Sequence, residues 1–303
     1  MKTDTDPSGG EPSSPAESSP QKEPPARRDV DLRSAINAIS DVIQNRPRPL
    51  RDFDQIHMKA GDMVIQSEIV ASWADGKTLA FIGDGDAISV CVAYLLTRNV
   101  LDYGPKLIKV FDFDERTVQA IKRFADRERI EHLDAQLYNC LDAFPDENKF
   151  DCFYTNPPWG ASNNGESVNA FMQRGFEAIR YDGDGMVVIA DDDELAWPKQ
   201  VLASVQGFAA RQGFYVSRMQ RKLHEYHLDD APELKSCNLY FSALPGNGSK
   251  CPTSEALTDP HRLKNFYGEN QAPTVRYVKE KKKPDYGKAP EEEYWLDYLE
   301  DGK

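Results

Sequence analysis

The sequence predicts an α/β fold of the Rossmann-like, nucleotide-binding kind with a mostly parallel sheet. Short apolar runs typical of buried strands alternate with helical segments along the middle of the chain. Strands that alternate with helices are joined by right-handed crossovers and pair in parallel. A glycine turn follows the first strand and an acidic residue ends the second, at the sheet edge where such folds bind ligands.

The expected elements follow in order from the N-terminal side. Aliphatic residues at three- and four-residue spacings predict a short amphipathic helix within residues 29–50. Strands and helices then alternate, and two β-type segments close the series. The expected segments are strand 77–83, helix 87–97, strand 107–114, helix 115–128, strand 149–158, helix 166–180, strand 185–190, helix 198–213, and strands 214–220 and 236–244.

Composition divides the 303 residues into four parts. Residues 1–28 are dominated by Pro, Ser, Gly and Glu and are predicted to be disordered. Residues 29–50 hold the N-terminal helix, and residues 51–245 form the Rossmann-like domain. Residues 246–303 are poor in aliphatic side chains, so we expect a flexible tail with an acidic, aromatic end.

Charge and cysteine usage limit the class of partner. The net charge of −13 disfavours nucleic acid, which needs a basic surface, and would attract a small cationic amine. No apolar run is long enough to span a membrane, and the five cysteines show no CxxC pairing. We therefore expect a cytoplasmic protein in a reducing compartment, and a homodimer is compatible with the sequence.

The first chemical motif is the turn formed by Gly83, Asp84, Gly85 and Asp86 between a strand and a helix. Glycines allow the backbone to approach a ligand closely, and the helix N-terminus offers unpaired N–H groups. Two acids there would repel a pyrophosphate but suit a cofactor with a ribose and a cationic amine. An ordinary Asp-capped helix is an equal alternative.

Two further acids extend this cofactor site. Asp112 ends the second strand, where a carboxylate can accept hydrogen bonds from both ribose hydroxyls. Asp142 precedes the next strand and could accept from an adenine amine, although a plain loop residue explains it equally well.

The strongest signal is the turn of Asn156, Pro157, Pro158 and Trp159 at the end of a strand. The prolines fix φ and remove donors, which leaves the asparagine side chain free to accept from a substrate amine. The tryptophan can stack on a planar group or lie over a cation. A neutral amide cannot act as a general base, so its predicted role is to orient the nitrogen lone pair toward the donor carbon.

Other polar residues follow the later strands. Asp191 and Asp192 could bind a polycation, although an acidic run is more often a solvated helix start. His224, Glu225 and Tyr226 mix metal-ligand and substrate-binding types. Because spacing places no third ligand, substrate binding by Glu225 and Tyr226 is preferred and no metal is expected.

These motifs, taken together, resemble the C-terminal catalytic domain of the bis(aminopropyl)spermidine synthases, the branched-chain polyamine synthase family. The resemblance implies a class I S-adenosylmethionine-dependent transferase fold. It also implies decarboxylated S-adenosylmethionine as donor and transfer of aminopropyl groups to a polyamine nitrogen. The motifs that carry it are Asp54-Gln55, the acidic turn 83–86, the segment 110–116, the Asn-Pro-Pro turn and the HEY segment 224–226.

Two departures from the family pattern leave alternatives open. Gly85 replaces the middle acid of the usual Gly-Asp-Asp-Asp turn, and Asn156 replaces the Asp expected to take a proton from the attacking amine. The Asn-Pro-Pro-Trp form also resembles amino-group methyltransferases that use S-adenosylmethionine itself. A binding protein on a degenerate transferase fold is the third hypothesis. We further expect the acidic segment 291–301 to fold over a polycationic acceptor.

Overall fold

The computed structural model describes Met1 and residues 30–145, 149–229, 231–281 and 293–299. The strands are β1 (Thr78–Ile82), β2 (Leu107–Asp112), β3 (Leu133–Leu137), β4 (Cys152–Thr155), β5 (Asp184–Asp191), β6 (Phe214–Glu225), β7 (Lys235–Ala243), β8 (Val275–Glu280) and β9 (Tyr294–Tyr298). The α-helices are α1 (Leu32–Asn45), α2 (Ala60–Trp73), α3 (Ile88–Thr97), α4 (Glu115–Glu128), α5 (Glu166–Ala178), α6 (Ala196–Arg211) and α7 (Pro260–Leu263), and short 3₁₀ helices cover Arg51–Phe53 and Asn247–Lys250.

The main sheet has seven strands in the order β3-β2-β1-β4-β5-β7-β6. Strands β1 to β5 pair in parallel, whereas β7 runs antiparallel to both of its neighbours. This order, with an antiparallel strand inserted next to the last position, is typical of class I S-adenosylmethionine-dependent transferases. The predicted fold class is therefore confirmed.

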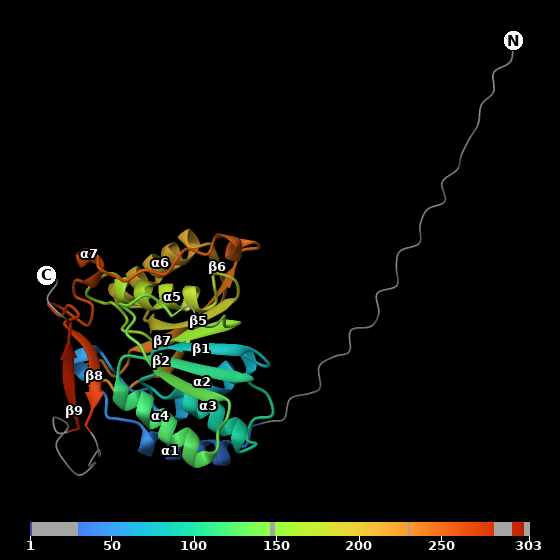
Figure 1. The fold of residues 1–303 in the computed structure, drawn as a ribbon, viewed down its shortest axis with the longest axis vertical. Helices are drawn as coiled ribbons and strands as arrows, with labels where there is room; N and C mark the ends of the chain where they lie inside the picture. Colours follow the sequence, from blue (N-terminus) through green and yellow to red (C-terminus); the bar gives the residue numbers. More distant parts are fainter. Residues whose placement is uncertain (2–29, 146–148, 230, 282–292, 300–303) are drawn as a thin grey trace.

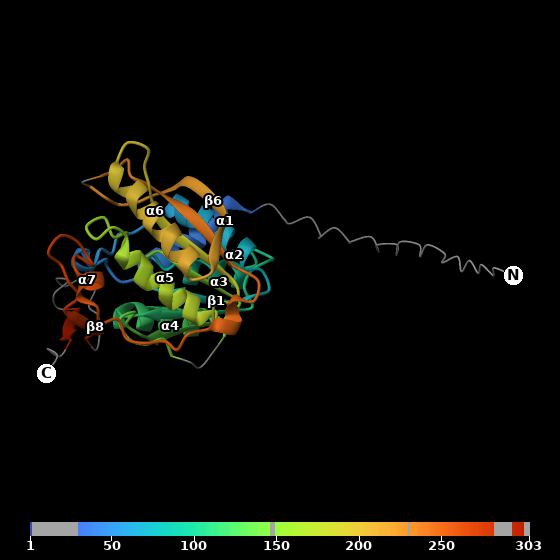
Figure 2. The same cartoon turned by 90° about the horizontal axis from the view of Figure 1, so that it is seen from above.

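Helices cover both faces of the sheet. Figures 1 and 2 show α5 and α6 on one face and α1 to α4 on the other. The central strand β1 alternates between the two cores: Leu79 and Phe81 pack on the α1–α4 side, and Ala80 and Ile82 on the α5–α6 side. Burial on both faces explains why the sequence of this strand is continuously apolar.

Local signals set the start of several helices. The Asp31 carboxylate accepts from Arg33 N–H and caps α1, and the Asp114 carboxylate accepts from Arg116 N–H and caps α4. Two elements of the main domain were not predicted. Helix α2 buries residues around much of its circumference, so it shows almost no amphipathic period, and β3 is a short strand at the sheet edge.

The prediction of a flexible tail from residue 246 onward is wrong for the described part of that segment. Strands β8 and β9 pair into a hairpin that lies beside α4 (Figure 1). Val275 and Val278 of the hairpin are buried against Leu50 and Phe53. A segment with few aliphatic residues is thus ordered because it packs on another part of the molecule instead of forming a core of its own.

Some expectations fall outside the described residues. Apart from Met1, the predicted disordered segment 1–28 lies among them, and so do positions 291, 292, 300 and 301 of the acidic end. In the part of the chain that the structure describes, no helix is both long enough and apolar enough to cross a bilayer.

Candidate active site

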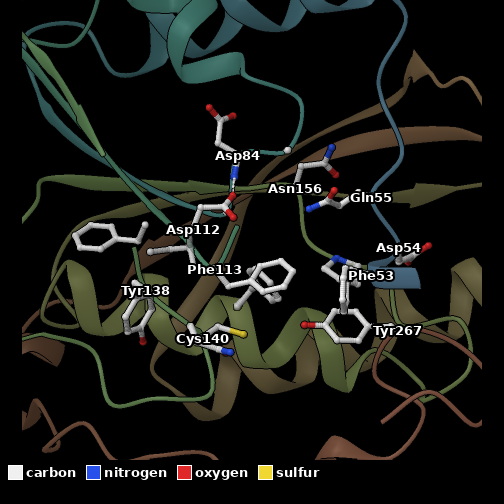
Figure 3. A pocket seen from close by; sticks show the side chains of 17 residues that line it. Phe53, Asp54, Gln55, Asp84, Asp112, Phe113, Tyr138, Cys140, Asn156 and Tyr267 are labelled. Carbon is white, nitrogen blue, oxygen red and sulfur yellow. Dashed lines mark hydrogen bonds between the residues drawn. The ribbon is translucent and has the colours of Figure 1, made fainter. Parts of the chain in front are cut away.

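A pocket opens beyond the carboxyl ends of β1, β2 and β4. Figure 3 shows side chains from several separate segments around it, including the loop before α2 and the C-terminal segment. The predicted site residues that line it are Gly83, Asp84, Gly85, Asp112, Asn156 and Pro158. The glycine turn after β1 and the Asn-Pro-Pro turn after β4 therefore meet at this pocket.

The acidic turn after β1 is shaped by Gly83 and Asp84. Gly83 has a φ of +73°, and a Cβ at this position would lie 3.2 Å from Cε1 of Phe171, so a side chain would be strained. The Asp84 carboxylate accepts from the N–H groups of Ile88 (2.9 Å) and Ser89 (3.2 Å) and from the Ser89 hydroxyl. The capping alternative thus holds for Asp84, which also lines the pocket.

Asp112 is fixed at the end of β2 by two backbone hydrogen bonds. Its Oδ2 accepts from Asp84 N–H at 2.9 Å, and its Oδ1 accepts from Asp114 N–H at 2.8 Å. Burial and the Asp114 carboxylate raise the pKa of Asp112 to about 7. Each oxygen retains a lone pair, so the placement suits the predicted ribose contact.

The Asn-Pro-Pro-Trp turn brings a second group of residues together. Asn156 Nδ2 donates to Asp86 Oδ2 at 2.7 Å, and Trp159 Nε1 lies 3.4 Å from Asn156 Oδ1. Trp159 packs edge-on against Tyr226, with ring centroids 5.0 Å apart. Asp86, Pro157, Trp159 and Tyr226 do not line the pocket itself; Asp86 and Tyr226 lie buried behind Asn156.

Asp142 does not line the pocket, so its predicted adenine contact has no support in the placement. Its carboxylate forms an ion pair with Arg276 of β8 at 3.2 Å and lies 3.4 Å from the Tyr277 hydroxyl. The loop after β3 instead turns Tyr138, Asn139 and Cys140 into the pocket lining. The sequence could not show this, because the partner of Asp142 comes from the hairpin that we expected to be flexible.

The acids after β5 and β6 also lie away from the pocket. Asp191 is buried and pairs with Arg221 at 2.7 Å, while Asp192 accepts from two backbone N–H groups at the start of α6. Glu225 lies between Lys59 (2.7 Å) and Lys235 (3.2 Å). These contacts give the three carboxylates structural partners, so their predicted substrate-binding role has no support in the placement.

Aromatic side chains that the sequence analysis did not single out complete the pocket. Phe53 packs edge-on against Phe113 (5.3 Å between centroids) and Tyr267 (5.5 Å), and all three line the cavity together with Phe171 (Figure 3). Phe113 directly follows Asp112, so its position beside the ribose acid was a usable signal. Tyr267 lies in the C-terminal segment and has no comparable signal.

The pocket lining contains acidic side chains and no basic ones among the described residues. Its charged residues are Asp54, Asp84 and Asp112, and none of the described residues that line it is Lys, Arg or His. Over the described ranges, no group of three or more His, Cys, Asp and Glu residues is arranged to hold a metal ion.

Two known proteins are similar in sequence to about half of this chain. The N(4)-bis(aminopropyl)spermidine synthase of Thermococcus kodakarensis is 28% identical over 152 residues, which cover 49% of this chain and 40% of that protein. The enzyme of the same name from Methanocaldococcus jannaschii is 25% identical over 149 residues, covering 48% and 39%. This chain therefore matches only about 40% of the length of these relatives.

A solved structure shows the same fold. The branched-chain polyamine synthase of Thermus thermophilus, in complex with N4-aminopropylspermidine and 5′-methylthioadenosine, superimposes with a TM-score of 0.60. The two sequences are 19% identical, and the match covers 78% of this chain and 69% of that one. The model of the branched-chain polyamine synthase A C-terminal domain family matches residues 34–297. The chain belongs to this family.

Proposed function

We propose that this protein transfers an aminopropyl group from decarboxylated S-adenosylmethionine to an amine nitrogen of a polyamine. The observation that carries the proposal is the charge of the pocket, whose described lining includes three carboxylates and no basic side chain. A donor that bears a carboxylate would meet repulsion there. The decarboxylated donor offers a sulfonium and an ammonium, both of which the carboxylates attract.

The reaction needs little from the protein beyond alignment. The amine lone pair attacks the carbon next to the sulfonium, a new C–N bond forms, and the C–S bond breaks with its electrons passing to sulfur. Methylthioadenosine leaves, and the alkylated nitrogen releases its proton. Holding the two reactants in line removes much of the entropic part of the barrier.

The pocket residues divide between the two substrates. Phe53, Phe113 and Tyr267 offer aromatic surface to an adenine ring, and Asp112 accepts from the ribose. Asn156 lies at the boundary with its amide oxygen available to the acceptor amine. Trp159 and Tyr226 pack against each other outside the pocket lining.

The relatives support the same assignment. Two curated relatives are N(4)-bis(aminopropyl)spermidine synthases, and the T. thermophilus structure contains an aminopropylated spermidine and methylthioadenosine. The departure at Gly85 leaves space and not a clash, since a Cβ there would approach nothing closer than Gln55 Cγ at 4.0 Å.

The first experiment is calorimetric titration of the full chain with S-adenosylmethionine and with its decarboxylated form at equal salt. We expect at least tenfold tighter binding of the decarboxylated donor, followed by release of methylthioadenosine when spermidine is added. Equal or tighter binding of S-adenosylmethionine would refute the proposal.

One observation favours a second candidate, an N-methyltransferase. Asn156 is neutral and occupies an Asn-Pro-Pro-Trp turn, a form similar to that of amino-group methyltransferases. Transfer of a methyl group to an amine, with preference for the carboxylated donor in the same titration, would establish that function. Binding of a donor without turnover of any amine would identify a binding protein on the transferase fold.

A further inference from the structure

A buried hydrogen-bonded chain runs behind Asn156, outside the pocket. On one side of the amide lies Asp86, whose Oδ2 is 2.7 Å from Asn156 Nδ2. On the other side the Tyr226 hydroxyl is 3.5 Å from the same nitrogen. Ser236 Oγ lies 3.0 Å from the Tyr226 hydroxyl, and His224 Nδ1 lies 2.9 Å from Ser236 Oγ. All four partners of the chain are buried.

The chemistry of these groups fixes which way the amide faces. An ionised carboxylate can only accept hydrogen bonds, so the side of Asn156 that faces Asp86 must be the NH₂. The second hydrogen of that NH₂ points toward Tyr226. The oxygen of Asn156 is then left on the other side, where, among the described residues, its hydrogen-bond partner is Trp159 Nε1 at a long 3.4 Å. Asn156 lines the pocket and Asp86 does not, and the oxygen is the amide atom that Asp86 and Tyr226 leave unused.

Asp86 is itself held rigidly. Its Oδ1 accepts from Met58 N–H at 2.7 Å, and its backbone carbonyl accepts from Arg46 Nη1 at 2.9 Å. Burial raises the pKa of Asp86, whereas the Met58 N–H, the Arg46 guanidinium and the Asn156 amide favour the ionised form. The side chain is thus held outside the pocket lining, and the pairing with a donor ammonium first expected of it has no support in this placement.

The far side of the chain has a consistent donor direction. If Asn156 donates to the Tyr226 hydroxyl, that hydroxyl can donate to Ser236 Oγ. The Ser236 hydroxyl can then donate to His224 Nδ1, so each group donates its own hydrogen. Burial lowers the pKa of His224 to about 4, so its imidazole is neutral at pH 7 and can accept at Nδ1. This direction is compatible with an NH₂ that points away from the pocket, and it places a hydrogen on His224 Nε2, which has no hydrogen-bond partner among the described residues.

We propose that Asp86, with a smaller contribution from Tyr226, is a positioning residue that locks the Asn156 amide with its oxygen toward the acceptor amine. The proposal rests on the aminopropyl transfer proposed above. An oxygen in this place accepts an N–H hydrogen bond from the attacking amine and aims the lone pair at the donor carbon. A flipped amide would present an NH₂ instead and compete for that lone pair.

Asp86→Asn is the diagnostic variant, because it keeps the shape and can donate to Asn156 as well as accept. We expect kcat for spermidine to fall about 10- to 100-fold, the size of loss typical of a misplaced alignment group. Donor affinity by calorimetry should stay within twofold, since Asp86 does not line the donor pocket. A loss of donor affinity that matches the loss of kcat would contradict a positioning role.

The reciprocal double variant, Asp86→Asn with Asn156→Asp, separates positioning from direct catalysis. The amide introduced at position 86 can donate to the carboxylate introduced at position 156, so an acceptor oxygen again faces the amine. We expect its kcat to exceed those of both single variants, Asp86→Asn and Asn156→Asp, by at least fivefold, because a carboxylate at position 156 beside Asp86 lacks the donor that the exchange supplies. If the double variant is no more active than Asp86→Asn, the Asp86 carboxylate acts on the substrate itself and the proposal is wrong.

A readout without activity keeps the two proposals apart. In ¹⁵N-asparagine-labelled protein, the Asn156 NH₂ signals are assigned by their absence in Asn156→Asp. We expect slow hydrogen exchange in the wild type and at least tenfold faster exchange in Asp86→Asn. Tyr226→Phe should give a smaller acceleration, and Tyr240→Phe, on the same strand β7 as Ser236, none. Unchanged exchange in Asp86→Asn would overturn the positioning role, whereas a wild type inert toward every polyamine would overturn only the proposed transfer.

Discussion

Two groups of carboxylates lie at the same edge of the main sheet, and their surroundings differ. Asp84, Asp86 and Asp112 follow β1 and β2, and their hydrogen bonds come from backbone N–H groups and from neutral side chains. Asp191 and Asp193 follow β5, and they form ion pairs with Arg221 and Lys222. The same sequence signal, acids after a strand, thus produces a cluster held by hydrogen bonds from uncharged groups in one place and a salt-bridged cluster in the other.

The difference appears in the pKa of the acids. Burial raises the pKa of Asp112 to about 7 and also raises those of Asp84 and Asp86. Hydrogen bonds from Lys222 and Arg221 lower the pKa of Asp193 to about 2. Burying carboxylates without a cation is costly, and such groups gather at binding sites where a ligand supplies the missing charge. The first cluster therefore carries the functional hypothesis and the second does not.

The largest effect is expected from Asp112→Asn. The variant loses the charge that attracts a cationic donor and one acceptor for the ribose, and we expect donor affinity to fall about 100-fold, or about 3 kcal/mol. Calorimetric titration with decarboxylated S-adenosylmethionine measures it. Asp191→Asn in the other cluster is the matched comparison and should bind the donor within twofold of wild type. Similar losses of donor affinity in both variants would contradict the proposed difference between the two clusters.

The second prediction concerns the stability of the ion-paired cluster. Asp191→Ala removes the partner of Arg221 and an acceptor for Lys222 N–H, so we expect the free energy of unfolding to fall by about 1–2 kcal/mol. Urea denaturation of wild type and variant gives the value. A variant as stable as wild type but with a raised KM for spermidine would indicate that Asp191 binds the substrate, as the sequence predicted.

The third prediction uses pH. Because the folded-state pKa of Asp112 is about 7 and the ordinary value is 3.8, the folded protein retains a proton between pH 4 and 7 that the unfolded chain has lost. Stability should therefore decrease as pH rises through that window. Donor binding prefers the ionised carboxylate, so affinity should increase about tenfold from pH 6 to pH 8. His57 stays neutral there, because burial lowers its pKa to about 3.

A flat affinity profile in Asp112→Asn is the control for this pH dependence. The same slope in wild type and in Asp112→Asn would assign the titration to another group.

The smallest effect is expected at Glu225. Its carboxylate pairs with Lys59 and Lys235 at a partly exposed position, where ion pairs contribute little. We expect Glu225→Gln to leave the Tm within about 2 °C and KM for spermidine within twofold, by thermal unfolding and steady-state kinetics. A tenfold rise in KM would reinstate the substrate-binding role first predicted for Glu225.

Motifs that lie on strong local signals were predicted well. The strands with continuous apolar runs, the capped helices and the turns after β1 and β4 could all be found in the sequence. Helix α2 and strand β3 could not, because one lacks an amphipathic period and the other is too short. The hairpin β8–β9 was missed since its partners, Leu50 and Phe53 among them, lie more than 200 positions away.

The sequence by itself determined the alternation of strands and helices, and with it the sheet edge at which Asp112 and Asn156 meet. These features depend on local periodicity and on the fixed direction of parallel strands. Only the tertiary structure decided which acids line the pocket and which form an ion pair with a distant Arg or Lys. Arg276 forms an ion pair with Asp142, and Arg221 forms one with Asp191. Among the described residues, no Arg or Lys forms an ion pair with Asp112, which accepts two backbone hydrogen bonds. The partners in these ion pairs are far apart in the sequence, so the sequence alone does not show which acid is paired.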